Sequence, residues 1–373
     1  MRPHLSAVLV ATLFAAGCGE VSPKGGSPTP APADTPTAAP SASPAPATAP
    51  LATTAVKPGE LRTFGDWTVG CDNIGLCQMA SLAADNAVPE GVTMALLRQP
   101  GGGGAVDLSF DAVGDEPAVA PVAVTIDGRR LPLGTLNGSS AMAVARAMAG
   151  GRSLAVLERG GRVRARLSIA GVSAALRWID AQQGRAGTVA ALVARGDRPV
   201  AAVPEARPAP VIRAAIPTAA ATPPTEAQLA DMRRRAGCDE QAAAGTYGAP
   251  EHHALGHGAT LVILPCSTGA YNLSSTLFVI RDGVVAPAET DAPVGFDASP
   301  AAGTDRLASV VNGAWKDGEL TSYAKGRGLG DCGVHQTFVW DGSRLRLTEQ
   351  SEMGECRGNP NYITTWRAQV VRG

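Results

Sequence analysis

The stretch TFVWDGSRLRLTE, residues 337–349, contains the pattern that decides the fold. Two runs of strand-forming residues flank the pair Asp341-Gly342, and Asp-Gly between such runs is a strong signal for a β-hairpin turn. The same pair occurs at three other turns: Asp127-Gly128, Asp282-Gly283 and Asp317-Gly318. Repeated hairpins predict antiparallel sheets and not alternating strand and helix units.

Strand-like runs extend this pattern over most of the chain. They lie at residues 67–71, 76–80, 92–98, 105–110, 119–126, 154–157, 162–169, 260–264, 277–281, 284–286, 307–315, 320–324, 337–340 and 345–349. Short helices are expected at residues 141–149, 173–181 and 188–194, and a fourth begins with the capping box Thr225 and Gln228 and ends at Gly237. The sequence therefore predicts a mainly β (α+β) protein, with two antiparallel β-sandwich-like domains and short peripheral helices.

Two segments rich in Pro and Ala divide the chain. Residues 19–58 have no hydrophobic period and cannot bury a core, so we expect a disordered tether. A second such segment separates two parts of about 140 and 150 residues, each large enough for its own core. The expected parts are a signal peptide (1–17), a lipidated tether (18–58), a first β-rich domain (59–197), a linker (198–224) and a second β-rich domain (225–373).

The first residues have the features of a lipoprotein signal peptide. Arg2 precedes an uncharged, mostly apolar run from Leu5 to Ala16, which is too short to remain as a membrane span. Small residues then precede Cys18, whose thiol would take diacylglycerol, and with an N-acyl chain this exceeds the two-chain requirement for stable anchoring. The alternative is an ordinary signal peptide followed by an unrelated cysteine. Gly19 stands where Asp would indicate inner-membrane retention, so we expect a lipid-anchored envelope protein, periplasmic or surface-exposed, with the outer membrane favoured.

Six further cysteines are expected to form disulfides, because an even number in an exported chain indicates a disulfide framework. A zinc site is the alternative interpretation of these cysteines, but the closely spaced C-x₂₋₄-C pairs that such a site favours do not occur. Cys71 and Cys77 flank a turn between two strand-like runs, within cross-strand disulfide reach. The other four cysteines follow the linker, so local pairing is expected. The predicted pairs are Cys71–Cys77, Cys238–Cys266 and Cys332–Cys356.

Several strings of this sequence resemble a known bacterial family. They are FGDWTVGCDN (residues 64–73), Cys77, GRGLGDCG (326–333), CRG (356–358) and WRA (366–368). The mature chain resembles the domain-of-unknown-function family 1176, envelope proteins marked by six cysteines. The first domain is also similar to the invasion-associated locus B family, through its Trp-x-x-x-Cys start and the small-residue run GVSAAL (171–176). That family's mid-domain cysteines are missing here, and neither resemblance supplies catalytic residues.

The charge balance argues against a nucleic-acid partner. Removing residues 1–17 takes away one basic and no acidic side chain, which leaves 31 basic and 33 acidic ones, whereas nucleic-acid binders show a basic excess. No dinucleotide or P-loop motif occurs, so no cofactor is expected. The expected partners are the membrane, through the lipid anchor, and an anionic envelope component or envelope protein.

An arginine stripe is the principal binding candidate. Arg162, Arg164 and Arg166 have the period-2 spacing that places them on one strand face, with Val163, Ala165 and Leu167 toward the core. Arg159 precedes them. Arginine captures carboxylate or phosphate bidentately, so this face would suit an anion. The alternative is an ordinary solvated sheet face.

Two other segments are weighed as sites. The glycine-rich loop 326–333 ends near Cys332 and could present backbone N–H groups and Arg327 to an anion, or simply meet tight backbone geometry. His252, His253 and His257 are the metal candidates, but two glycines make the stretch a poor helix and the HExxH order is absent. An exposed loop entering a strand is the favoured interpretation, and no metal site is expected.

The favoured function is a non-enzymatic binding or structural role in the cell envelope, with a disulfide-stabilised body. The alternative is an envelope hydrolase that acts on cell wall or glycans. An enzyme would bring at least two acid or base side chains together in a cleft, whereas a binding module would present a rimmed surface patch.

Overall fold

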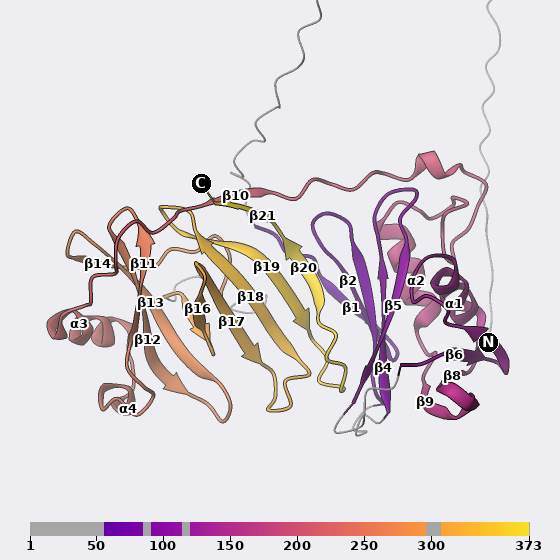
Figure 1. The fold of residues 1–373 in the computed structure, drawn as a ribbon, viewed down its shortest axis with the longest axis horizontal. Coiled ribbons are helices and arrows are strands. Elements are labelled where there is room, and N and C mark those ends of the chain that lie inside the picture. The colour runs from indigo at the N-terminus through magenta and orange to yellow at the C-terminus, as the bar shows by residue number, and fades with distance from the viewer. Residues whose placement is uncertain (1–55, 85–90, 114–119, 296–306, 373) are drawn as a thin grey trace, which may run out of the picture. The chain divides into compact units, whose positions relative to one another are not determined.

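The computed structural model describes residues 56–84, 91–113, 120–295 and 307–372 (Figure 1), all within one compact unit, Ala49–Gly373. The predicted signal peptide and all but the last three residues of the predicted tether, Cys18 included, lie outside the described residues. The fold is mainly β, with antiparallel sheets and few short helices, as predicted. Within the described part, no helix is both long and apolar enough to cross a membrane.

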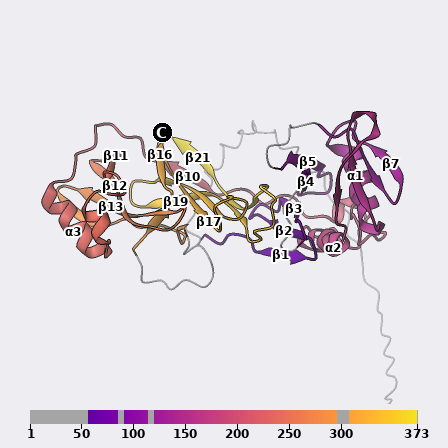
Figure 2. The ribbon, with the colours of Figure 1, turned by 90° about the horizontal axis from the view of Figure 1, so that it is seen from below.

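The first part of the chain contains two antiparallel sheets over one core. The first sheet is a meander of β1 Leu61–Phe64, β2 Trp67–Cys71, β3 Cys77–Ser81, β4 Val92–Arg98 and β5 Val106–Ala112. The second has the order β7 Arg129–Pro132, β6 Ala123–Ile126, β8 Leu154–Leu157 and β9 Val163–Leu167. Helices α1 Gly138–Gly150 and α2 Val172–Gln182 supply Val144, Met148, Leu176 and Ile179 to the shared core. Figure 2 shows β7 beside α1.

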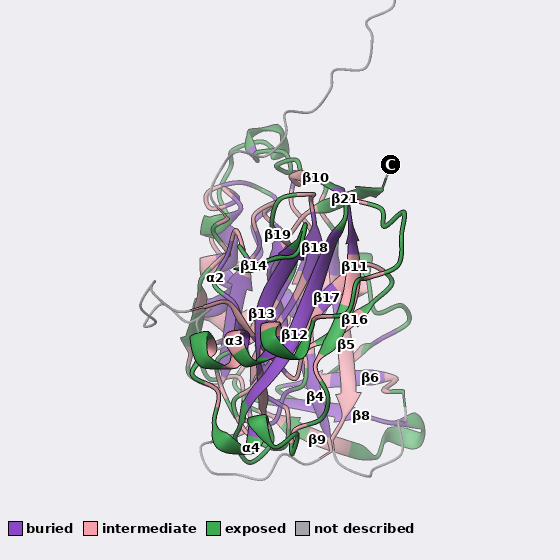
Figure 3. Cartoon of the chain, turned by 90° about the vertical axis from the view of Figure 1, so that its left-hand side faces the viewer, coloured by how far each residue is buried: buried purple, intermediate pink, exposed green. Residues whose placement is uncertain are grey.

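The second part also has two sheets that share a core. One contains β11 Glu251–Gly256, β12 Ala259–Thr268, β13 Leu273–Arg281, β14 Val284–Pro287 and β15 Ser309–Val311. The other contains β16 Ala314–Lys316, β17 Glu319–Lys325, β18 Gly333–Trp340, β19 Leu345–Met353 and β20 Ile363–Arg367. Strand β12 has both faces buried (Figure 3). Leu261 and Ile263 enter this shared core, and Val262 and Leu264 pack under helix α3 Glu226–Ala236.

The Asp-Gly turns have the backbone that the hairpin prediction requires. Asp127, Asp282 and Asp317 have φ of 49°, 51° and 53°, and each following glycine also has positive φ. Both central residues of a type I′ turn need that conformation. The fourth turn is longer: Trp340 pairs with Leu345, and the Asp341 carboxylate accepts the Ser343 and Arg344 amides.

Two elements differ from the sequence prediction. Residues 188–194 are not a helix, because the buried Asp180 carboxylate accepts the amides of Leu192, Val193 and Ala194 and holds them in a turn. The run 307–315 is not one strand but the separate strands β15 and β16. Asn312 breaks it with φ 45°, and its side chain accepts the Leu273 amide.

The segment predicted as a linker contains regular structure. Residues 200–202 form the 3₁₀ helix η2 (Val200–Ala202), and β10 Val211–Ala214 pairs in parallel with β21 Gln369–Arg372. Ile212 and Ala214 are buried with Val339. The short helix α4 Glu240–Ala243 follows α3. The division into domains at 198–224 stays a prediction.

Buried polar contacts join the two parts along a seam, formed by residues 59–83 and 357–367. Arg367 Nε lies 2.5 Å from Asp72 Oδ2, and the Asn73 side chain exchanges two hydrogen bonds with the Arg367 backbone. The Asn359 amide, fully buried, donates to the Ser81 and Met94 carbonyls. Hydrogen bonds of buried groups have strict geometry, so these contacts hold the two parts in register.

Candidate functional site

Strand β9 positions the predicted arginine stripe, but a β-bulge alters it. Leu157 pairs with Val163 and Val156 pairs with Ala165, so Arg164 is an extra residue between the two pairs. An extra residue reverses the alternation of side chains on one side of it. Ala165 and Leu167 face the core as predicted. Val163, expected inside, is 43% exposed. The prediction of one face for Arg162, Arg164 and Arg166 is therefore wrong.

Glu158 neutralises part of the stripe. Its Oε2 accepts Arg162 Nε at 2.9 Å and Nη2 at 2.6 Å, and Arg164 Nη1 lies 3.4 Å from Oε1. The side chains of Glu158 and Arg164 are only 5% and 11% exposed. A buried carboxylate requires such partners. Arg164 therefore has an internal role, whereas Arg166 is exposed.

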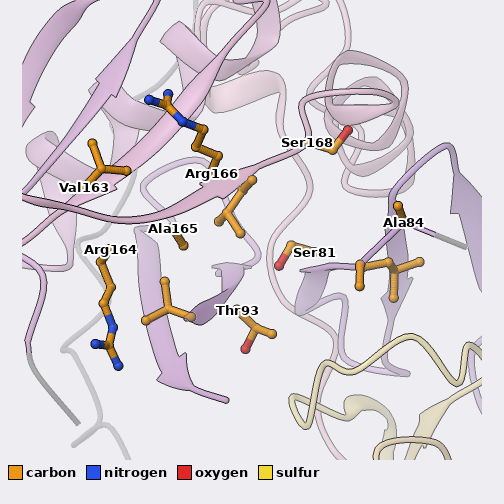
Figure 4. A pocket seen from close by; sticks show the side chains of 12 residues that line it. Ser81, Ala84, Thr93, Val163, Arg164, Ala165, Arg166 and Ser168 are labelled. Atoms are coloured by element: carbon orange, nitrogen blue, oxygen red, sulfur yellow. The ribbon is translucent and has the colours of Figure 1, made fainter. Parts of the chain in front are cut away.

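A cleft of about 500 Å³ runs along the free edge of β9 (Figure 4). Within the described residues β9 pairs only with β8, and side chains from both of its faces line the cleft. Opposite lie the end of β3 and the start of β4. Figure 4 shows the Arg164 and Arg166 guanidiniums on opposite sides of the strand. The polar lining consists of Ser81, Thr93, Arg164, Arg166 and Ser168, groups that hydrogen-bond and attract anions.

The sheet register assembles a different cationic surface, here called the arginine face: Arg130 and Arg166 on the sheet, with Arg159 in the adjoining turn. Arg130 pairs with Thr125, Thr125 with Ala155, and Ala155 with Arg166. Residues in register point to the same side of an antiparallel sheet, so both arginines lie on the face away from the core. Across three strand spacings of ~4.8 Å they are roughly 14 Å apart.

The turn η1, Arg159–Gly161, completes the arginine face. Gly160 and Gly161 have φ of 85° and 84°, which glycine adopts without strain. This turn lies over the sheet, since a Cβ on Gly161 would be 3.9 Å from Arg130 Nη1. Arg159 and Arg162 flank the two glycines. Arg162, next to the outward-facing Val163, turns to the opposite side of the sheet, where it pairs with Glu158.

Arg130 is not among the binding residues predicted from the sequence, although a signal for it exists. Residues 120–200 contain twelve arginines, no lysine and four acids, while the whole chain has a net charge of −1. The excess disappears when charge is summed over the whole mature chain. It also disappears within the predicted first domain (59–197), where 13 basic and 13 acidic side chains cancel, so only a shorter window reveals it.

The three disulfides are Cys71–Cys77, Cys238–Cys266 and Cys332–Cys356, which are the pairs that the sequence predicts. Cys71–Cys77 closes the β2–β3 hairpin directly across the strand pair. Cys18 lies outside the described residues.

The glycine-rich loop 326–333 has an internal partner for its arginine. Arg327 Nε and Nη2 lie 2.7 and 2.5 Å from the two oxygens of Asp331, which also accepts the Gly358 amide. The hydrogen bond from Arg327 holds the pKa of the Asp331 carboxyl below its ordinary value. An anion would have to compete with Asp331 for this guanidinium. Leu329, at the tip of the loop, is 76% exposed.

The three histidines lie on a strand and its turn. His252 and His253 belong to β11, whose side chains alternate, and His257 is in the following turn with φ 52°. His253 Nε2 lies 2.9 Å from Glu251 Oε2, and its ring stacks on Trp315 at 5.7 Å. Among the described residues, no group of three or more His, Cys, Asp or Glu could hold a metal ion.

The fold and its disulfides define a mainly β, disulfide-stabilised protein. The family described as "Protein of unknown function (DUF1176)" matches residues 61–369, and the chain belongs to this family. It is similar to "Uncharacterized protein YpfG" of Escherichia coli (strain K12), at 26% identity over 334 residues, 82% of this chain and 92% of that protein. No solved structure matches the chain. The similarity of the first part to the invasion-associated locus B family stays a prediction.

The strings that resemble the family gather at the seam and in the loop beside it. The string 64–73 forms two ion pairs with other strings, Asp66 with Arg357 and Asp72 with Arg367. Asp331 links the loop 326–333 to Gly358. These strings therefore hold the fold together, and the arginine face lies outside them.

Proposed function

We propose that this chain is a lipid-anchored protein of the cell envelope with a non-enzymatic role, which binds an anionic envelope component through the arginine face. The anchor part of the proposal rests on residues 1–18, where an apolar run and small residues precede Cys18. The three disulfides support the envelope location, because such bonds persist mainly in oxidising compartments outside the cytoplasm.

The observation that carries the binding role is the register that places Arg130 and Arg166 on one sheet face, beside the turn with Arg159. At low ionic strength the Debye length reaches ~30 Å, so both guanidiniums can attract one anionic partner across their separation of roughly 14 Å. Guanidiniums suit this role because each can bind a carboxylate or phosphate with two parallel hydrogen bonds.

Two measurements in cells test the anchor. Wild-type protein should enter the detergent phase after phase separation, and Cys18→Ala should leave an uncleaved or soluble species. Uncleaved protein keeps the apolar run of residues 5–16, which could carry it into the detergent phase without a lipid. Cleavage must therefore be verified by identifying the N-terminal residue of the protein. A cleaved Cys18→Ala protein that still enters the detergent phase would contradict lipid anchoring.

The binding role is tested with the anchor removed. The mature chain carrying Cys18→Ala is exported behind an ordinary cleavable signal peptide, purified, and mixed with washed envelope material. Retention should be strong at low ionic strength and fall with salt, because screening shortens the reach of exposed charges to ~8 Å at physiological ionic strength. Retention that does not depend on salt would argue against an anionic partner.

A further inference from the structure

Charge is segregated within this chain. Residues 120–200, here called the arginine-rich unit, contain twelve basic and four acidic side chains, so the rest of the chain contains 20 basic and 29 acidic ones. The unit has a net charge of +8 and the remainder −9. An anionic surface attracts residues 120–200 and repels the remainder of the chain. This favours an orientation in which residues 120–200 face that surface.

Most acids of the unit serve internal contacts. Glu158 pairs with Arg162 and Arg164, Asp180 accepts three backbone amides, and Asp127 accepts the amides of Arg152 and Ser153. The exposed arginines come from strands, helices and turns: Arg129, Arg130, Arg146, Arg152, Arg159, Arg162, Arg166, Arg177, Arg195 and Arg198. These arginines lie on more than one face of the unit: Arg129 pairs with the core residue Ile126, so it points to the other side of the sheet from Arg130.

We propose that the arginine-rich unit lies against the phosphate layer of an anionic lipid bilayer. This inference rests on the proposed function and names its anionic component. The outer sheet face that carries Arg130 and Arg166 can lie along a plane of headgroups, and guanidinium forks match phosphate oxygens. Val163 lies on the same sheet face as Arg166 and is 43% exposed, so it adds apolar contact at the headgroup level.

Vesicle binding tests this inference with the unlipidated mature chain carrying Cys18→Ala. The vesicles are phosphatidylcholine alone or phosphatidylcholine with phosphatidylglycerol. Binding should need phosphatidylglycerol and should disappear as the Debye length shortens from ~30 Å to ~3 Å with added salt. Replacing Arg130, Arg159 and Arg166 by Gln should weaken it at least about tenfold, because each arginine near an anionic surface is worth about fivefold.

A matched variant controls for net charge. Arg213, Arg234 and Arg344 are also exposed but lie outside the arginine-rich unit, and their replacement by Gln should leave vesicle binding within about twofold. Equal losses in the two triple variants, or no binding to phosphatidylglycerol vesicles, would overturn the inference. A chain that is retained on washed cell wall but not on vesicles would overturn it and leave the proposed function standing. Retention on neither material would refute both.

Discussion

Arg367 and Asp72 lie 295 positions apart in the sequence, yet the Arg367 Nε atom is 2.5 Å from Oδ2 of Asp72. The Asp72 side chain is completely buried, and its other oxygen accepts the Ile74 and Leu76 amides in the turn that Cys71–Cys77 closes. One carboxylate thus serves the β2–β3 hairpin and the seam together. A neutral side chain at this position would weaken both.

Asp72→Asn should therefore lower the free energy of unfolding by about 2–4 kcal/mol, because it leaves Arg367 without its buried charged partner. The urea midpoint, measured with both variants at one pH, gives the change. Arg372→Gln is the matched control. Its pair with Glu319 has side chains 46% and 41% exposed, so the loss there should stay below about 1 kcal/mol. Equal losses would mean that the Asp72 pair is no more than a surface contact.

Cleavage between the two parts should leave a noncovalent complex. A protease site inserted within the exposed residues 217–220 cuts the chain without crossing a disulfide, because each bond closes within one part. The fragments should co-elute under native conditions, since the seam contacts remain. They should separate in denaturant without reductant. Separation in buffer alone would show that the seam is weak, and fragments still joined in denaturant would contradict the disulfide pairs.

Arg164 and Arg166 should respond differently to the same change. Arg164→Gln removes a cation from the buried Glu158, so it should cost about 2–3 kcal/mol of stability. Arg166→Gln alters an exposed side chain and should stay within about 0.5 kcal/mol of wild type. Thermal unfolding of the two single variants, side by side, measures the difference. A larger loss at Arg166 would contradict the bulge that separates the two side chains.

Glu352 gives a pH dependence with a definite sign. Burial raises the pKa of its carboxyl above the ordinary 4.5, although Gln350 and Thr365 donate hydrogen bonds to it. The folded state then holds the proton more tightly than the unfolded state. Wild-type stability should therefore fall as pH rises from the unfolded pKa through the folded one.

Glu352→Gln removes the Glu352 contribution to the fall in stability with rising pH. The variant should gain stability over wild type more at about pH 7 than at about pH 4. Glu349→Gln, an exposed position on the same strand, serves as the control and should show the same difference from wild type at both pH values. If the stability of Glu352→Gln relative to wild type were lower at pH 7 than at pH 4, the assigned sign would be wrong.

The sequence predicts local structure well where one residue pair decides it. Asp-Gly pairs located four hairpins, and cysteine positions gave all three disulfides. The errors have a common cause, which is contact between segments that are not adjacent in the sequence. Asp180 prevents the helix at 188–194, and β21 recruits β10 out of the predicted linker. The bulge at Arg164 depends on its pairing with β8, which period-2 counting does not detect.

The candidate site shows the same limit. Arg130 and Arg166 are 36 positions apart in the sequence, and only the register of β7, β6, β8 and β9 places them on one face. The arginine content of residues 120–200 is visible in the sequence, but which of these arginines share one face follows only from the sheet order.

We propose that the arginine face binds an anionic envelope component and does not stabilise the fold. Retention on washed envelope material and thermal stability, measured on one preparation of the Arg130, Arg159 and Arg166 to Gln variant, test this most directly. These three are chosen because changing Arg162 and Arg164 would remove cations that pair with Glu158. The free energy of unfolding of the variant should stay within about 1 kcal/mol of wild type, and its retention at low salt should be at least about fivefold weaker. Equal retention of variant and wild type would contradict it.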